Sequence, residues 1–90
     1  MLCSAAHIII YGKVQGVSFR ASTQTKASEL NIKGWVRNLP NGIVEVHAEG
    51  NCENLDKFIK WCRKGPPFAQ VSKCDLDWVI PEEVHSFQIL

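Results

Sequence analysis

Hydrophobic and polar residues follow different periods along this chain, and the changes of period divide it into strands and helices. Apolar, β-branched or alternating runs predict strands over residues 6–11, 33–38, 43–49 and 69–78, with a short last strand over 86–90. Two stretches carry apolar residues at helical spacing, from Phe19 to Leu30 and from Glu53 to Lys64. The predicted order is therefore β-α-β-β-α-β with one additional strand.

Residues that favour caps and turns separate these elements. Ser18 is expected to be the N-cap of the first helix, and Asn31 can adopt the left-handed conformation that ends it. The run Leu39-Pro40-Asn41-Gly42 predicts a turn between the two middle strands. In the strand over 69–78 the alternation slips between Val71 and Cys74, which predicts a β-bulge.

Two interlocked β-α-β units in this order predict the ferredoxin-like fold, a two-layer α+β sandwich. Its antiparallel sheet would have four to five strands, the first four in the order 4-1-3-2, with both helices on one face. The first two strands run parallel in this topology, so their C-terminal ends lie at the same edge of the sheet. We therefore expect the loop after Tyr11 to lie beside Asn38.

The strand over 43–49 predicts one buried and one exposed face. Its apolar residues, Val44, Val46 and Ala48, would point inward, and Glu45, His47 and Glu49 would point to solvent. His7, His47 and His85 all fall on predicted strand faces, where exposed or half-buried positions are more common than catalytic ones.

Composition limits the kind of protein this can be. The chain has 90 residues, which fits a single domain over residues 1–90, and its 46% hydrophobic and 21% charged content is that of a globular protein. The net charge is +1, whereas proteins that bind nucleic acid or anionic membranes usually have a strong basic excess. Any anion that this protein binds must therefore be held locally.

No apolar run approaches the roughly 20 residues that a membrane-spanning helix needs. The first eleven residues have no basic residue ahead of their apolar stretch, so they resemble a strand more than a secretion signal, and we expect a cytoplasmic protein.

The four cysteines are irregularly spaced and include no C-x-x-C pair, so no metal site is expected from them. Cys62 lies on an apolar helical stripe and should be a small buried side chain. The predicted topology brings Cys3 and Cys52 to the same edge of the sheet, so a disulfide between them is an alternative to the free thiols that a reducing compartment favours.

The segment from Gly12 to Arg20 joins a strand to the start of a helix. Successive amides in such a loop, together with the free N–H groups of the first helical turn, form a concave anion site. Arg20 is a cation in that first turn, where the helix dipole favours an acidic residue instead. An anion held by both the amides and the guanidinium would resolve this conflict. The alternative is a loop that only turns the chain, with Arg20 reaching into solvent.

Asn38 is expected at the same edge of the sheet as this loop. Its carboxamide both donates and accepts hydrogen bonds, so it could orient a water molecule without carrying charge. The simpler interpretation is that Asn38 introduces the turn that follows it.

Two motifs resemble those of a known family. Residues 12–20 match the acylphosphatase signature G-x-V-Q-G-V-x-[FY]-R at every fixed position. Residues 34–50 match the second acylphosphatase pattern, which includes Gly34-Trp35-Val36-Arg37-Asn38 and then Gly42, Val44 and Gly50. The resemblance extends from the first strand to the end of the chain.

This resemblance implies an enzyme that hydrolyses acyl phosphates to a carboxylate and inorganic phosphate without metal or cofactor. It implies that Asn38 positions the attacking water, and that the phosphoryl group is held by Arg20 and the backbone amides of residues 15 to 20: Gln15, Gly16, Val17, Ser18, Phe19 and Arg20. Inorganic phosphate or sulfate should compete with the substrate. We expect a monomer, because the sheet edges should be short, with no nucleic-acid or membrane partner.

Two other functions are considered. Tyr11 and Trp35 on the open sheet face could stack bases in an RNA-binding module, but the strand over 43–49 has no aromatic residue and the net charge is near zero. A non-catalytic phosphate-binding domain is the other alternative, and the presence of both Arg20 and Asn38 counts against it.

Overall fold

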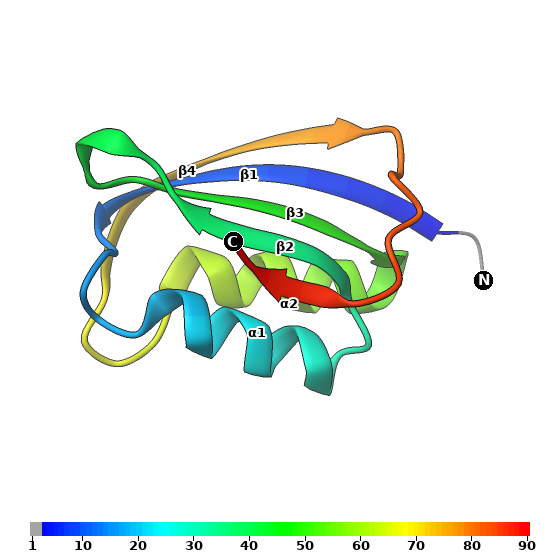
Figure 1. Ribbon diagram of the computed structural model, residues 1–90, viewed down its shortest axis with the longest axis horizontal. Helices are drawn as coiled ribbons and strands as arrows, with labels where there is room; N and C mark the ends of the chain where they lie inside the picture. Colours follow the sequence, from blue (N-terminus) through cyan, green and yellow to red (C-terminus); the bar gives the residue numbers. More distant parts are fainter. Residues whose placement is uncertain (1–2) are drawn as a thin grey trace.

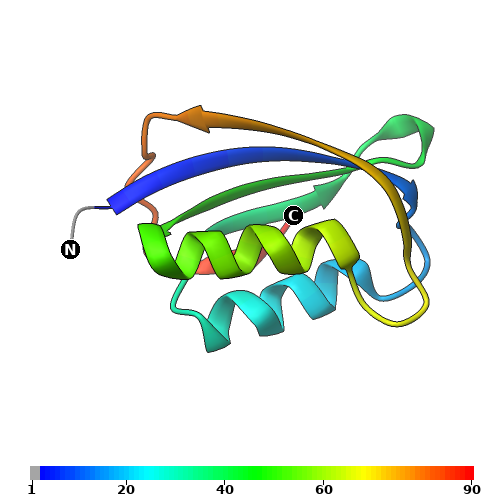
Figure 2. The same cartoon turned by 180° about the vertical axis from the view of Figure 1, so that it is seen from behind.

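The structure is a computed structural model that describes residues 3–90. Its elements are β1 (Cys3–Lys13), α1 (Phe19–Glu29), β2 (Lys33–Asn38), a single 3-10 turn at Pro40–Gly42, β3 (Val44–Asn51), α2 (Cys52–Lys64), β4 (Gln70–Val79) and β5 (Phe87–Ile89). Both helices pack against the same face of one sheet, as the two opposite views in Figures 1 and 2 show. The predicted ferredoxin-like α+β sandwich is therefore confirmed.

The sheet has the strand order β4-β1-β3-β2-β5. The first four strands pair antiparallel as expected, but β5 pairs parallel to β2, with Gly34 opposite Phe87 and Val36 opposite Ile89. The prediction of a wholly antiparallel sheet is wrong for this strand. Because β4 ends at the end of the sheet where β2 begins, a short connection brings the chain beside the start of β2, and β5 then runs in the same direction.

The hydrophobic core lies between the sheet and the helices. The side chains of Ile8 and Ile10 on β1 meet those of Leu55 and Phe58 on α2, and each is at most 1% exposed. Cys62 also lies in this core, as predicted, and burial raises the pKa of its thiol. Cys52 is a free, exposed thiol, as expected for a reducing compartment, and the side chain of Cys3, its partner in the alternative of a disulfide, lies outside the described part of the structure.

The predicted bulge and turns are found, with one exception. Tyr11 pairs with Lys73 and Gly12 with Val71, so Ser72 is the extra residue of a β-bulge in β4. Asn31 has a φ of 55° just after α1, as expected for a helix stop. Ser18 precedes α1, but it has a φ of 62° and its side chain makes no capping hydrogen bond. Ser18 is therefore the N-cap residue by position, as predicted, but its hydroxyl does not cap the helix.

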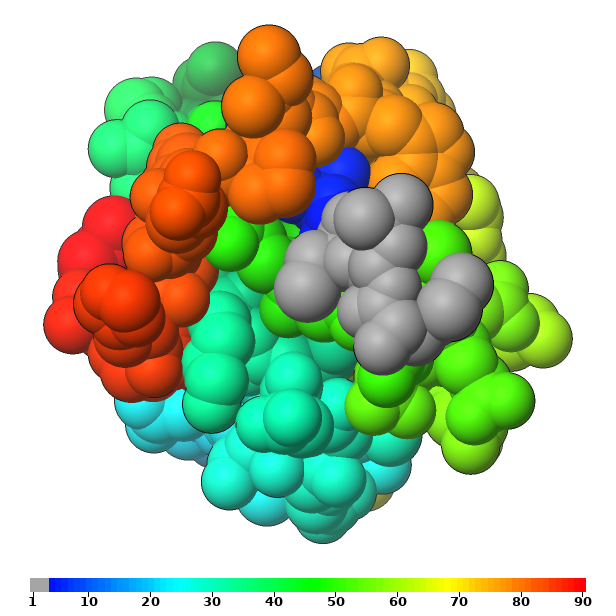
Figure 3. Space-filling model, turned by 90° about the vertical axis from the view of Figure 1, so that its right-hand side faces the viewer, coloured from blue at the N-terminus to red at the C-terminus, as the bar shows by residue number. Residues whose placement is uncertain are grey.

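The predicted exposed face of β3 is in fact partly buried. His47 and Glu49 are 3% and 7% exposed because the chain between β4 and β5 crosses over them. The Glu49 carboxylate accepts hydrogen bonds from the backbone N–H groups of Glu82 and Glu83, the second at 3.1 Å, and lies 2.6 Å from Nε2 of His47. Figure 3 shows this connecting segment, in orange to red, running across the end of the molecule.

The expectation of short sheet edges is wrong for β4, which is 10 residues long and lies at the edge of the sheet. Its bulge at Ser72 and its charged side chains, Lys73, Asp75 and Asp77, are features that hinder pairing with another strand.

Within residues 3–90, no helix is long and apolar enough to cross a bilayer.

Replacement of Glu49 with Gln should destabilise the protein. Burial raises the pKa of this carboxyl, but the hydrogen bonds from His47 and the backbone amides outweigh that effect and lower the pKa below 4.5. A carboxyl with a lowered pKa stabilises the fold above its unfolded-state pKa, and this contribution is lost as the pH falls through the folded-state pKa. We expect Glu49→Gln to lose about 1–3 kcal/mol of unfolding free energy at pH 7.

Urea denaturation at pH 7 and at several values below pH 4.5 would measure this effect. The difference between the wild type and Glu49→Gln should shrink as the wild-type carboxyl becomes protonated. Glu83→Gln, which changes an exposed carboxylate on the same segment, is the control and should have little effect at pH 7. Equal stability of the wild type and Glu49→Gln at pH 7 would contradict the role given to Glu49.

Candidate active site

The loop between β1 and α1 has the backbone shape of an anion site. Gly16 and Ser18 both have positive φ angles, 74° and 62°, so the chain alternates its handedness just before the first turn of α1. Such alternation turns successive N–H groups toward one side. An added Cβ at Gly16 would meet nothing within 4 Å, so the left-handed backbone, and not lack of space, accounts for a glycine here.

Arg20 lies in the first turn of α1, and that turn contains no acidic residue. Its Nη1 donates to the backbone oxygen of Leu90 at 3.5 Å, a long contact that leaves most of the guanidinium N–H groups available. The helix N-terminus and the guanidinium therefore both present positive charge on this side of the molecule.

Asn38 is the last residue of β2. It lies at the end of the sheet where β1 also finishes. Its side-chain oxygen Oδ1 is buried and has no hydrogen-bond partner among residues 3–90. A buried oxygen without a partner is costly, and such groups in folded proteins usually receive a water molecule or a ligand. Asn38 thus departs from the usual pairing of buried polar atoms.

A cavity of about 210 Å³ joins these features, which confirms that the loop and Asn38 are neighbours. It is lined by Val14, Gln15, Gly16, Ser18, Phe19, Arg20, Ala21, Asn38 and Ile89. Of the described residues that line it, Arg20 is charged and none is acidic or a histidine. The cavity therefore suits a small anion and offers no side-chain base.

Three of the predicted phosphate-binding residues use their side chains elsewhere. Val17 does not line the cavity, and its half-buried side chain packs against the core. The ring of Phe19 is buried and lies 5.7 Å from the ring of Trp61. The Gln15 side chain donates to backbone oxygens of the β2–β3 turn, Leu39 at 2.9 Å and Ile43 at 2.8 Å. For all three, a backbone amide is the group that remains for an anion.

The sequence analysis did not identify Val14, Ala21 or Ile89 as part of this cavity. Val14 and Ala21 lie within or next to the motif that carries Arg20, so the motif could have suggested them. Ile89 reaches the cavity because β5 pairs parallel to β2, and no local pattern in the sequence predicts that pairing.

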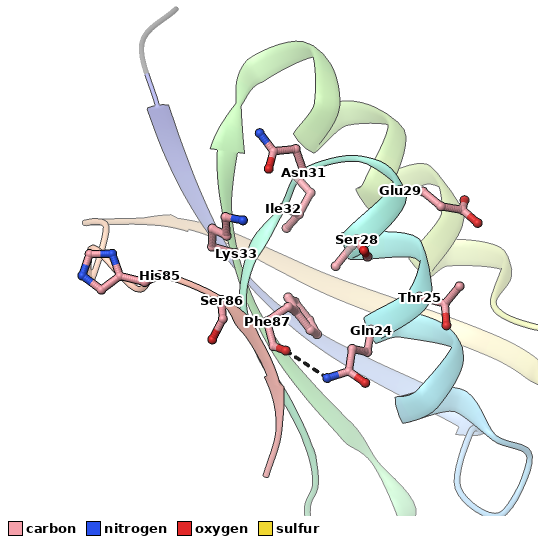
Figure 4. Close-up of a pocket in the computed structure, with 11 residues that line it drawn as sticks. Gln24, Thr25, Ser28, Glu29, Asn31, Ile32, Lys33, His85, Ser86 and Phe87 are labelled. Carbon is pink, nitrogen blue, oxygen red and sulfur yellow. Dashed lines mark hydrogen bonds between the residues drawn. The ribbon is translucent and has the colours of Figure 1, made fainter.

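A larger groove of about 680 Å³ lies between α1 and the chain around β5, and it contains none of the predicted site residues. Figure 4 shows its polar lining, with Gln24 donating to the backbone oxygen of Phe87 at 3.0 Å. Its charged residues, Lys33 and Glu29, have opposite signs and so define no binding preference. The predicted site residues thus gather at the smaller cavity.

Among the described residues, one group has the composition of a metal site. His47, Glu49 and Glu82 bring possible ligand atoms within 4.8 Å of one another. The Glu49 carboxylate already accepts hydrogen bonds from two backbone N–H groups and faces His47. These contacts connect β3 to the chain between β4 and β5, and they account for the three residues without a metal ion.

Comparison with known proteins agrees with this site. The family model described as acylphosphatase matches residues 6–89. A protein named acylphosphatase from Methylococcus capsulatus is 48% identical over 85 residues, covering 93% of this chain and 92% of that protein. One from Acaryochloris marina is 52% identical over 82 residues, covering 91% and 88%.

A solved structure supports the same assignment. The structure of an acylphosphatase from Coxiella burnetii matches with a TM-score of 0.94 and 38% identity, covering 98% of this chain and 93% of that one. The family model, the relatives and this fold all agree with the two motifs that form the cavity. This chain belongs to the acylphosphatase family.

Proposed function

We propose that this protein hydrolyses the carboxyl–phosphate bond of acyl phosphates in the cavity formed by the β1–α1 loop, Arg20 and Asn38. The observation that carries the proposal is the convergence of two groups on one cavity of about 210 Å³. One is a positively charged loop and helix end, and the other is the buried, unpartnered oxygen of Asn38. An anion and a water molecule would satisfy these two groups separately.

Arg20 and the backbone amides of residues 15 to 20 would hold the phosphoryl group. Arg suits this task because its planar guanidinium can form two parallel hydrogen bonds to phosphoryl oxygens. Negative charge on these oxygens is redistributed as the bond to the leaving group breaks. Fixed amide dipoles and a guanidinium would stabilise that charge without reorganising during the reaction.

Asn38 would position the attacking water. Its Oδ1 can accept a hydrogen bond from a water molecule, which turns the lone pair of that water toward phosphorus. The oxygen of the water forms a bond to phosphorus while the bond from phosphorus to the carboxyl oxygen breaks. The leaving group is a carboxylate of low pKa and needs no acid, and the proton from the water passes to a phosphoryl oxygen. The products are a carboxylate and inorganic phosphate.

This mechanism assigns every step to the chain and the substrate, so we propose that it requires neither metal nor cofactor. Inorganic phosphate or sulfate would compete for Arg20 and the loop amides.

We further propose that the enzyme is a cytoplasmic monomer, with no nucleic-acid or membrane partner. The bulge at Ser72 and the charged side chains of the β4 edge support the monomer, and the thiols of Cys62 and Cys74 support a reducing compartment.

The direct test is to incubate the purified protein with an aryl acyl phosphate and a chelator and to follow phosphate release. We expect turnover well above spontaneous hydrolysis in the presence of the chelator, and competitive inhibition by inorganic phosphate. Phosphate binding without turnover would instead support a non-catalytic domain. Turnover that appears only with added metal would contradict the mechanism.

Replacement of Arg20 with Ala should weaken phosphate binding and remove nearly all turnover. Charge-assisted hydrogen bonds to phosphate are worth about 1.5–3 kcal/mol each, so phosphate affinity should fall about 10- to 100-fold. Turnover should fall by about 10³-fold or more, because the transition state loses its side-chain cation. Steady-state kinetics and phosphate titration would measure both. Arg63→Ala removes the same charge from an exposed position on α2 and should leave both unchanged.

Replacement of Asn38 with Ala should separate turnover from stability. We expect turnover to fall about 100-fold or more while phosphate affinity stays within about threefold of the wild type, because Arg20 and the loop remain. The free energy of unfolding should fall by no more than about 0.5 kcal/mol, since the variant removes a buried oxygen that has no partner.

Asn51→Ala is the matched control for this separation. The side-chain oxygen of Asn51 accepts from the backbone N–H of Asn54 at 2.8 Å and caps α2. This variant should lose about 1 kcal/mol of stability and keep full turnover. Full turnover in Asn38→Ala would show that Asn38 does not orient the water.

A further inference from the structure

We propose that the Gln15 side chain is a positioning residue that fixes Asn38 relative to the phosphate-binding loop. The proposal rests on the proposed function and adds a component to it. Gln15 lies in the loop that would hold the phosphoryl group, and its side-chain amide donates to the two residues that flank the turn after Asn38.

The geometry places Gln15 across the end of the β2–β3 hairpin. Asn38 and Val44 form the last pair of the β2–β3 ladder, and Leu39 and Ile43 follow them on either side of the turn. The Gln15 Nε2 atom donates to the backbone oxygens of both Leu39 and Ile43, at 2.9 and 2.8 Å. A carboxamide nitrogen has two hydrogens, so both donors of this side chain are used.

The same two residues also bond to each other. The Leu39 N–H donates to the Ile43 oxygen at 2.9 Å, so the Ile43 oxygen accepts from Leu39 and from Gln15. The hairpin is thereby closed at the position next to Asn38, and its closure depends on a side chain from the loop. Gln15 is 24 and 28 residues away in sequence from Leu39 and Ile43, and its one amide group connects the loop to both.

This connection matters because hydrolysis requires two separate parts to be aligned. The loop and Arg20 would set the position of phosphorus, and Asn38 would set the position of the water. An error of about 1 Å between two such parts can reduce turnover about 100-fold. Phosphate binding needs only the loop and Arg20 and should not depend on this alignment. Loss of the Gln15 side chain should therefore affect turnover more than affinity.

The test is a double-mutant cycle with Gln15→Met and Asn38→Ala. Met has about the length of Gln and has no N–H groups, and the variant keeps the backbone amide at position 15. We expect Gln15→Met to lower kcat by about tenfold or more while the inhibition constant of inorganic phosphate stays within about threefold. In the Asn38→Ala background the same substitution should change kcat by less than about twofold, because there is no longer an Asn38 to align.

Gln24→Met is the matched control. Gln24 also uses its side-chain amide to connect two elements, through the oxygen of Phe87 at 3.0 Å, but this hydrogen bond lies at the larger groove (Figure 4) and not at the turn after Asn38. It should leave kcat within about twofold of the wild type. Denaturation curves for each variant would establish that the kinetic measurements are made on folded protein.

Several results would overturn the proposal. One is a kcat for Gln15→Met within twofold of the wild type, and another is an equal loss of kcat in both backgrounds, which would mean that Gln15 acts independently of Asn38. A phosphate inhibition constant that rises in parallel with the loss of kcat would assign Gln15 to phosphate binding instead. Failure of the proposed function itself is recognised separately, because the wild type would then show no turnover, or Asn38→Ala would show full turnover.

A measurement that needs no turnover completes the test. The side-chain amide resonances of Asn38 can be followed by NMR in protein labelled with nitrogen-15. Gln15→Met should shift or broaden these resonances, and Gln24→Met should leave them unchanged. Identical Asn38 resonances in the wild type and Gln15→Met would overturn the proposal even if the enzyme were inactive on every acyl phosphate tested.

Discussion

The pairing of β1 and β2 with the strand between them is the constraint on which the site depends. Both strands run antiparallel to β3, so they run parallel to each other. Their C-terminal ends therefore lie at the same end of the sheet. The loop that follows β1 and the last residue of β2 therefore share one cavity. The antiparallel pairing brings together Arg20 and Asn38, which come from separate motifs in the sequence.

Two buried polar groups at opposite ends of the molecule differ in whether they have hydrogen-bond partners. At the far end, the Glu49 carboxylate is surrounded by donors, and its pKa is lowered although burial alone would raise it. At the cavity, the Asn38 oxygen is buried with no partner among the described residues. The first arrangement satisfies a buried charge within the chain, and in the proposed mechanism the second leaves an acceptor for the attacking water. Such local conflicts are expected where a protein binds a ligand.

The sequence predicted the features that depend on local patterns. The four main strands, the two helices, the stop at Asn31 and the bulge in β4 follow from periodicity and turn residues, and the two motifs identified the cavity. The pairing of β5 with β2, and hence its direction, could not be predicted, because a strand of three residues has too short an alternation pattern to identify its partner. His47 and Glu49 alternate with apolar residues like an exposed face, and only the chain that crosses them from β4 to β5 buries them. Ser18 has the residue type of a helix cap, but the loop holds it in a left-handed conformation.

The connection from β4 to β5 gives the two ends of the molecule a mechanical link. Two backbone N–H groups of this connection are bound to one carboxylate on β3, and a few residues later the same chain brings Ile89 to the wall of the cavity. The free length of chain between that anchor and the cavity is short. The rim of the cavity that β5 forms thus belongs to a segment whose other end is anchored to β3 at the opposite end of the protein.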